Sequence, residues 1–306
     1  MDGSAFRNIG LVGQGTQGPM IAFRCALAGK HPYIYDVLPG RLDEAGQKIR
    51  QWLRERVSQG RLTEEEAEAA LGRVHVCRTL ADCVADADLV IEVVSEKLDL
   101  KRRVWAEIDS LAPAKTILSS NTSSFRLSEM YVDVKRKDRT YTQNFQLPLE
   151  DDVVEVMWGP ETSEDTRRAA KTFLKSIGMI VLETKKENKG YSWNRTWRAI
   201  KKEVLRLVDQ GYSDVDDLDR AFMLVLGCKM GPFQIMDYAG LDVIRDVEIS
   251  YYEDSGDPSD KPPKILEDLV AKGHYGVKTG KGFYTYPNPD FERPGWLYKQ
   301  GEFEDN

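Results

Sequence analysis

The feature that most constrains how this chain folds is a glycine-rich segment near its start. Residues 13–18 read Gly-Gln-Gly-Thr-Gln-Gly, a G-x-G-x-x-G pattern. The pattern follows the short apolar run Asn8–Val12 and opens Thr16–Gly29, whose apolar residues recur at helical spacing. A second apolar run, Pro32–Tyr35, is followed by Asp36, eighteen residues after the last glycine. This order of strand, glycine turn, helix, strand and acidic residue is typical of a unit that binds a dinucleotide.

The glycines of this loop have separate physical roles. Gly13 permits a tight turn, Gly15 lets the backbone approach a pyrophosphate, and Gly18 lets the helix pack closely on the strand. The start of the helix, at Thr16 and Gln17, offers free N–H groups and a partial positive charge to the phosphates. A glycine turn that served the fold alone would not require the acidic residue downstream. We therefore predict that these five residues bind the cofactor.

Asp36 selects between the two common dinucleotides. A carboxylate accepts hydrogen bonds from both ribose hydroxyls of NAD, whereas it repels the 2′-phosphate of NADP by about 1–4 kcal/mol. Arg41 lies nearby, but no basic residue directly follows Asp36. The sequence therefore predicts NAD as the cofactor and Asp36 as its ribose ligand.

The first half of the chain alternates short apolar runs with helical patterns. Further runs occur at Asp88–Val94 and Thr116–Ser119, and Arg41–Leu71 and Leu98–Leu111 have helical spacing, the former as two helices. Such alternation predicts an α/β fold, with a doubly wound parallel sheet covered by helices on both faces. After Lys185 the patterns are helical.

Three helices are expected in the second half, at Asn194–Asp209, Asp217–Leu226 and Phe233–Tyr238. The charged run Glu183–Lys189 suggests the joint between two domains. We therefore predict a Rossmann-like domain over residues 1–186 and an all-helical C-terminal domain over residues 187–306.

Composition excludes several classes of protein. The 306 residues are 41% hydrophobic and 30% charged, as in ordinary globular proteins. The net charge of −7, without a dominant basic block, argues against a nucleic-acid partner. No apolar stretch approaches the ~20 residues that cross a bilayer, and the first residues lack the pattern of a secretion signal. The four cysteines, which have no C-x-x-C spacing, are Cys25, Cys77, Cys83 and Cys228. We expect a cytoplasmic protein with no membrane partner and no metal site.

Six segments of the sequence resemble the 3-hydroxyacyl-CoA dehydrogenase family, which includes the short-chain L-3-hydroxyacyl-CoA and L-gulonate 3-dehydrogenase types. The segments, in family order, are ADLVIEVVSEKLDLK, ILSSNTSS, VVEVM, GYSWNR, MGPFQIMDYAGLD and GVKTGKGFYTY. The resemblance implies NAD-linked transfer of hydride to or from a small 3-oxo or 3-hydroxy acid or acyl-CoA. It also implies that the helical domain binds substrate and forms a homodimer.

The resemblance assigns roles to individual residues. Those matching Val93, Glu96, Lys101 and Ser123 line the nicotinamide half of the cofactor, and Ser123 also matches the hydroxyl that bonds the reacting oxygen. Asn194 matches an asparagine beside the substrate. Serine and asparagine can orient a carbonyl or an alcohol without changing charge. The competing interpretation is that Ser123 and Asn194 only cap helices.

The chain departs from the family pattern at the acid–base element. The family has a histidine in an H-x-x-N-P loop and, twelve residues later, a glutamate in a strand. Glu155 matches the glutamate, which sets Gln143 at the histidine position and Gln146 at the asparagine position. Glutamine can donate a hydrogen bond but cannot exchange a proton near pH 7. The three histidines, His31, His75 and His274, lie in no motif that replaces it.

Three functions remain open. The chain can be an NAD-dependent 3-hydroxy-acid dehydrogenase slowed about 10²–10⁴-fold by the lost base. It can be an imine reductase or amine dehydrogenase, because hydride transfer to an iminium carbon leaves no alkoxide to protonate. It can also be a non-catalytic NAD-binding protein.

In the second of these functions Glu155, beside the Gln143 amide, would hold a cation, and Tyr191, Trp193 and Trp197 would form an aromatic wall around it. The alternative for the two tryptophans is ordinary core packing, since they stand four residues apart on a helix. A buried Glu155 needs a partner, for which Gln143, the backbone or a ligand are the candidates, or it carries the proton itself.

Overall fold

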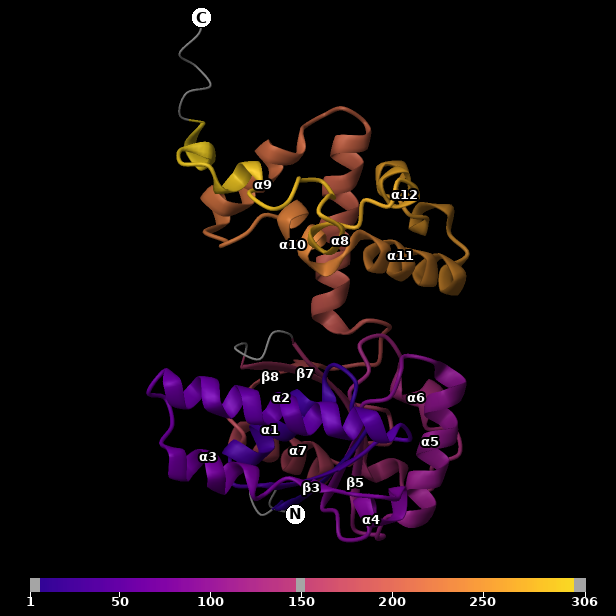
Figure 1. Cartoon of the computed structure of the whole chain (residues 1–306). Coiled ribbons are helices and arrows are strands. Elements are labelled where there is room, and N and C mark those ends of the chain that lie inside the picture. The colour runs from indigo at the N-terminus through magenta and orange to yellow at the C-terminus, as the bar shows by residue number, and fades with distance from the viewer. Residues whose placement is uncertain (1–5, 147–151, 300–306) are drawn as a thin grey trace, which may run out of the picture. The chain divides into compact units, whose positions relative to one another are not determined.

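The computed structural model describes residues 6–146 and 152–299. The chain forms two compact units that divide between Arg195 and Thr196 (Figure 1). This division falls inside α8 (Tyr191–Asp209), a few residues beyond the predicted boundary at 186/187, which stays a prediction. Among the described residues, no helix is both long and apolar enough to span a membrane.

The first unit is built on one eight-stranded sheet with the order β3-β2-β1-β4-β5-β6-β7-β8. The strands are β1 (Asn8–Val12), β2 (His31–Tyr35), β3 (His75–Val76), β4 (Leu89–Glu92), β5 (Ile117–Ser120), β6 (Thr140–Phe145), β7 (Val153–Met157) and β8 (Ile180–Thr184). All neighbours pair in parallel except β6 and β7, which are antiparallel. The order reverses at β1, as in doubly wound folds.

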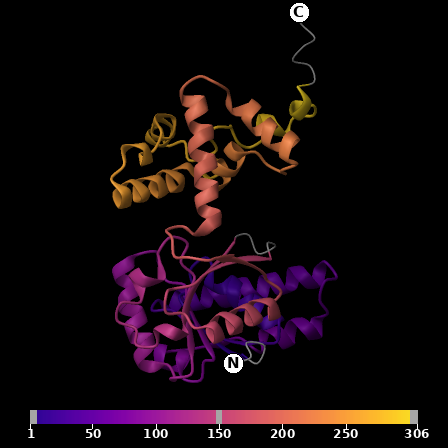
Figure 2. The ribbon, with the colours of Figure 1, turned by 180° about the vertical axis from the view of Figure 1, so that it is seen from behind.

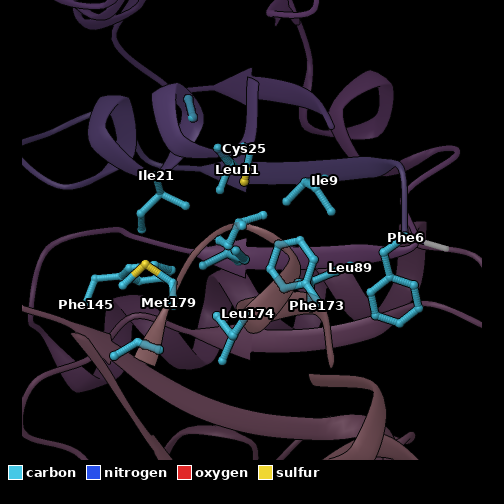
Figure 3. Packing of buried hydrophobic residues seen from close by; sticks show 14 of the residues in the cluster. Phe6, Ile9, Leu11, Ile21, Cys25, Leu89, Phe145, Phe173, Leu174 and Met179 are labelled. Carbon is cyan, nitrogen blue, oxygen red and sulfur yellow. The ribbon is translucent and has the colours of Figure 1, made fainter. Parts of the chain in front are cut away.

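Helices cover both faces of this sheet, as Figures 1 and 2 show from opposite sides. The helices of this unit are α1 (Gly18–Leu27), α2 (Pro39–Ser58), α3 (Glu64–Leu71), α4 (Leu80–Val84), α5 (Leu98–Leu111), α6 (Leu127–Met130) and α7 (Glu164–Ser176). Buried side chains of α1, α2, α3 and α7 form one apolar cluster with the sheet (Figure 3), and those of α4, α5 and α6 form another. The α/β prediction is therefore confirmed.

Local sequence explains most of these elements. Apolar runs become buried strands because β4 and β5 have helices on both sides. Thr63 and Glu66 form the capping box that starts α3. Arg41–Leu71 forms the two predicted helices, α2 and α3. The sheet is mostly parallel, and its one antiparallel pair is that of β6 with β7 among the described residues.

The second unit is helical, as predicted. It contains most of α8 together with α9 (Val215–Leu226), α10 (Pro232–Ala239), α11 (Leu241–Ser255) and α12 (Lys264–Ala271). Its apolar core includes Val204, Phe233, Leu241 and Leu266.

Two buried aspartates organise this core. Asp219 accepts from the backbone N–H of Phe233 at 2.8 Å, at the start of α10. Asp237 accepts from the N–H of Tyr284 at 2.9 Å, in the segment after α12. Each therefore ties two parts of the helical unit together.

Candidate functional site

The glycine-rich loop lies at the carboxyl ends of β1 and β2. Gly13 has φ +107°, and a Cβ there would stand 2.6 Å from the Val93 carbonyl oxygen. A Cβ at Gly18 would overlap the Gly13 carbonyl oxygen, whereas a Cβ at Gly15 would have no protein atom within 4 Å. Gly13 and Gly18 therefore serve the turn and the packing of α1, and Gly15 borders open space.

Asp36 is fixed beside this loop. Its Oδ2 accepts from the N–H of Gln14 at 2.7 Å, and its Oδ1 accepts from the N–H of Leu38 at 2.9 Å. A pocket of about 290 Å³ begins here. Its lining includes Gly13, Gly15, Asp36, Leu80, Val93 and Leu100.

This pocket fits the adenosine half of NAD. Apolar side chains suit a flat base, a carboxylate suits the ribose hydroxyls, and Gly15 leaves room for a pyrophosphate at the start of α1. Thr16 is exposed in the same loop. The Gln17 side chain donates from Nε2 to the Phe145 carbonyl oxygen at 3.3 Å, which joins the loop to the end of β6.

Lys101 occupies the centre of a buried charge cluster. Its Nζ lies 2.8 Å from Glu92 Oε1 and 3.1 Å from Glu96 Oε2. Burial alone would lower the pKa of Lys101, but the carboxylates of Glu92 and Glu96 outweigh burial and raise it. Lys101 is fully buried, so it acts by holding Glu96, the more exposed of its two partners, beside the Ser123 loop.

Ser123 and Asn194 come together in the structure. The Asn194 Nδ2 donates to the Ser123 carbonyl oxygen at 3.2 Å. Glu96 Oε1 accepts from the N–H groups of Ser123 and Ser124, at 3.1 Å and 3.0 Å, and from the Thr122 hydroxyl. The loop is thus held by its backbone, and Ser123, which is exposed, presents its hydroxyl to the surroundings.

Glu155 has its partners at the start of α8. Its Oε1 accepts from the Thr184 hydroxyl at 2.7 Å and from the Ser192 N–H at 2.9 Å. The Trp193 N–H donates to both carboxylate oxygens, at 3.3 Å and 3.2 Å. A carboxylate at a helix N-terminus is favoured by the helix dipole, and these donors fix the Glu155 side chain at the start of α8. Of the candidate partners, the backbone is the one observed.

Gln143 does not meet Glu155. In the β6–β7 ladder Gln143 pairs with Val156, and Glu155 pairs with Asn144. Because side chains alternate along a strand, Gln143 and Glu155 project from opposite faces of the sheet. Gln143 is fully buried and accepts a hydrogen bond from the Tyr141 hydroxyl at 2.9 Å. The predicted Gln143–Glu155 pair is therefore corrected.

The remaining predicted pocket residues have different surroundings. Gln146 is half-buried just after β6, and Trp193 is 48% exposed. Tyr191 is fully buried, and burial, reinforced by the carboxylates of Glu96 and Glu155, raises its pKa well above the usual value. Trp197 packs against the apolar core of the helical unit, as expected if this tryptophan serves core packing. An aromatic wall made of all three rings stays a prediction.

Asn144 and Thr184 are two residues of this site that were not predicted from the sequence. Thr184 donates a hydrogen bond to Glu155, and Asn144 is the residue of β6 that pairs with Glu155. Nothing local marks Thr184, because it reaches Glu155 through the pairing of β8 with β7. Asn144 could have been found only from the alternation of side chains along the strand. The antiparallel register of β6 and β7 decides which residue of TQNF shares a face with Glu155.

Comparison with known families gives two matches that together span most of the chain. Residues 8–187 match the model described as 3-hydroxyacyl-CoA dehydrogenase, NAD binding domain. Residues 190–286 match 3-hydroxyacyl-CoA dehydrogenase, C-terminal domain. The two matches adjoin just before α8.

Individual relatives agree with these matches. The chain is 31% identical over 284 residues to a 5-formyl-3-hydroxy-2-methylpyridine 4-carboxylate 5-dehydrogenase of Mesorhizobium japonicum, covering 92% of this chain and 91% of that protein. It is 31% identical over 288 residues to the mitochondrial hydroxyacyl-coenzyme A dehydrogenase of Homo sapiens, covering 92% and 91%. The crystal structure of a (S)-3-hydroxybutyryl-CoA dehydrogenase from Ralstonia eutropha superposes with TM-score 0.87 at 28% identity, covering 92% of this chain and all of that one.

Proposed function

Because the chain belongs to the 3-hydroxyacyl-CoA dehydrogenase family of NAD-dependent oxidoreductases, we propose that it transfers hydride between NAD and a 3-hydroxy or 3-oxo carbon of a small acid or acyl-CoA. The names of the relatives described above give different substrates, so we propose the substrate class rather than take it from a relative. We also propose that the acid–base site differs from that of the family, because it lacks the histidine.

The observation that carries this proposal is the joining of Ser123 to Asn194. The Asn194 amide holds the Ser123 backbone, while Glu96 fixes the same loop from the other side. An exposed serine hydroxyl on a fixed loop is a preorganised donor for a carbonyl or alkoxide oxygen. Both residues belong to the unit that carries the dinucleotide pocket.

Each residue of the site has a defined task. Bound NAD supplies the hydride acceptor or donor. The chain binds the dinucleotide at Gly15 and Asp36, orients the reacting oxygen with Ser123, and holds the Glu155 side chain at the start of α8. No histidine of the described residues belongs to this set, since His31 and His75 lie in β2 and β3 and His274 lies in the other unit.

A second candidate function, reduction of an imine, is favoured by the charge of this face. Glu155 and Glu96 are both acidic residues, and both lie near Tyr191. An anionic pocket stabilises an iminium cation, and hydride addition to that carbon leaves a neutral amine without a proton transfer. The same scaffold then acts as an amine dehydrogenase in the reverse direction.

One assay separates the candidates. NADH absorbance is followed with acetoacetyl-CoA, and separately with a ketone plus ammonia, while NADH binding is measured by calorimetry. Oxidation of NADH with acetoacetyl-CoA supports the first proposal. Turnover only with ketone and ammonia supports the imine reductase and removes the first proposal. NADH binding without turnover in either mixture leaves a non-catalytic NAD-binding protein.

We also propose that the chain forms a homodimer through its helical domain. The end of α9 exposes Leu224, Val225 and Leu226, and the adjoining α10 exposes Ile235 and Tyr238. An apolar patch of this kind marks a contact surface on a soluble domain. Light scattering should give twice the chain mass for the protein and one chain mass for Val225→Glu, and a monomeric parent protein would contradict the proposal.

A further inference from the structure

Asn144 is the side chain that the sheet sets beside Glu155. The two residues are directly paired in the β6–β7 ladder, so they share a face, with Cβ atoms about 4.5–5.5 Å apart. Asn144 is 6% exposed. Thr142, two residues earlier on the same face, pairs with Ser120 of β5, from which the chain continues to Ser123. Asn144 therefore lies between the Ser123 loop and Glu155.

Gln143 belongs to the other face. Its ladder partner Val156 and its strand neighbours Tyr141 and Phe145 are part of the apolar cluster formed with α1 and α7 (Figure 3). No movement of a side chain brings Gln143 to Glu155, because a whole strand would have to slip by one residue.

Glu155 has room for one more donor on the shared face. Within residues 6–146 and 152–299, its Oε1 accepts from Thr184, Ser192 and Trp193, whereas its Oε2 accepts from Trp193 only. A carboxylate oxygen can accept two hydrogen bonds. The amide group of Asn144 is the side chain placed to approach that oxygen.

We propose that Asn144, held beside Glu155, is a second polar side chain that faces the reacting oxygen together with Ser123, so that this site polarises the substrate without exchanging a proton. The inference rests on the proposed function. In the oxidation, the C–H bond breaks as hydride leaves for NAD⁺, the O–H bond breaks, and its proton passes to water or hydroxide. In the reduction, hydride adds to carbon and the alkoxide takes its proton from water.

The groups that face this position come from three elements. Glu155 stands on β7, Glu96 follows β4, and Tyr191 begins α8 near both carboxylates. Lys101 forms ion pairs with Glu92 and Glu96. An imidazole placed here therefore meets an anionic neighbour, whereas an imidazole at position 143 enters an apolar cluster.

The test compares Asn144→His with Gln143→His in the full-length protein. Beside Glu155 an imidazole gains a partner and its pKa rises, so its contribution to stability is present at pH 5.5 and is lost as the pH rises through that pKa. In the apolar cluster the pKa of an imidazole falls, so Gln143→His loses stability as the pH falls. Thermal unfolding from pH 5.5 to 8 measures the opposite pH dependences of stability, and NMR titration measures the opposite pKa shifts of the introduced imidazoles. Neither measurement requires enzymatic activity.

Kinetics supply the second readout. For the parent protein, log kcat/KM for alcohol oxidation should rise with pH without a plateau near neutrality. Asn144→His should introduce a plateau and raise the rate about 10²–10⁴-fold. Asn144→Leu, which removes the polar group without adding charge, should lower carbonyl reduction about 10²-fold.

The outcomes separate this inference from the proposed function. A raised imidazole pKa and a rate gain in Gln143→His, with neither in Asn144→His, overturn the assignment of Asn144. A raised pKa in Asn144→His without turnover of any 3-oxo substrate supports the assignment of Asn144 and contradicts the proposed function.

Discussion

In the NAD-binding domain Gly15 of the glycine-rich loop borders open space, whereas Gly276 and Gly282 of the helical domain allow the chain to pack against itself. A Cβ at Gly15 would meet no atom within 4 Å. A Cβ at Gly276 or Gly282 would overlap Asp237. The same residue type therefore makes room for a ligand in one domain and for a buried carboxylate in the other.

Buried carboxylates of the two domains also differ in the partners that hold them. Glu92 is held by the Lys101 ammonium group at 2.8 Å. Asp219 and Asp237 accept only from neutral donors among the hydrogen bonds found for them, such as the Tyr284 hydroxyl at 2.9 Å and the Phe283 N–H at 3.0 Å. Glu92 thus has a cationic partner next to the cofactor loop, whereas Asp219 and Asp237 link parts of the helical domain through neutral donors; the helical domain also has a buried ion pair, between Glu248 and Arg198 at 2.8 Å.

The largest expected effect is that of Lys101→Met. The substitution leaves Glu92 buried without its cation, which should lower the free energy of unfolding by about 3–5 kcal/mol. Urea denaturation measures it. The matched control is Lys137→Met, which removes an exposed pair with Glu161 at 3.8 Å and should cost about 0–1 kcal/mol. Equal stability of the two variants would contradict the role of Lys101 in compensating the buried charge of Glu92.

Gly282→Ala should destabilise the helical domain by about 2–3 kcal/mol, because its methyl group overlaps Asp237 Oδ1. Gly273→Ala is the control, since it has φ +73° and free space for a Cβ, so that only backbone strain of about 1 kcal/mol applies. Denaturant titrations compare them. If Gly282→Ala is no less stable than the control, the packing role of this glycine is wrong.

Gly15→Ala should separate binding from stability. Its methyl group projects into the pocket beside Asp36, so the affinity for NADH should fall about tenfold, or about 1.4 kcal/mol, while the unfolding curve stays unchanged. Gly13→Ala, with φ +107° and a contact at 2.6 Å, should lose stability as well. Calorimetry with NADH and thermal melting give the two quantities, and an unchanged NADH affinity in Gly15→Ala would count against the pocket.

The smallest expected effect is a pH dependence at Asp219. Burial raises the pKa of Asp219 to about 6, above that of an unfolded aspartate, so its contribution to stability is present at low pH and lost as the pH rises through 6. The advantage of the parent protein over Asp219→Asn should therefore shrink by about 1 kcal/mol between pH 5 and pH 7.5.

Asp260→Asn is the control for this measurement. Hydrogen bonds from Lys202, Ser255 and Arg198 hold the pKa of Asp260 below its usual range. Its contribution is lost only as the pH falls below about 4, so the difference between parent and variant should stay constant from pH 5 to pH 7.5. The same slope in both variants would remove the proposed difference between the two aspartates.

Much of the first domain follows from local sequence. The run Asn8–Val12, the glycine loop and Asp36 are separated by fixed short distances, and each adopts the predicted structure because its neighbours in sequence are also its neighbours in space. The joining of Ser123 to Asn194 was reachable only through the family resemblance, since 71 residues separate them.

The sequence by itself determined the glycine turn, the position of the acidic residue beside it and the order of the two domains, because these depend on spacing along the chain. Only the tertiary structure decided which residue stands beside Glu155. Counting twelve residues back from Glu155, as the family pattern requires, gives Gln143. The antiparallel pairing of β6 and β7 instead sets Asn144 beside Glu155. A shift of one residue moves a side chain to the other face of a sheet, and long-range hydrogen bonding, which no local pattern encodes, fixes that shift.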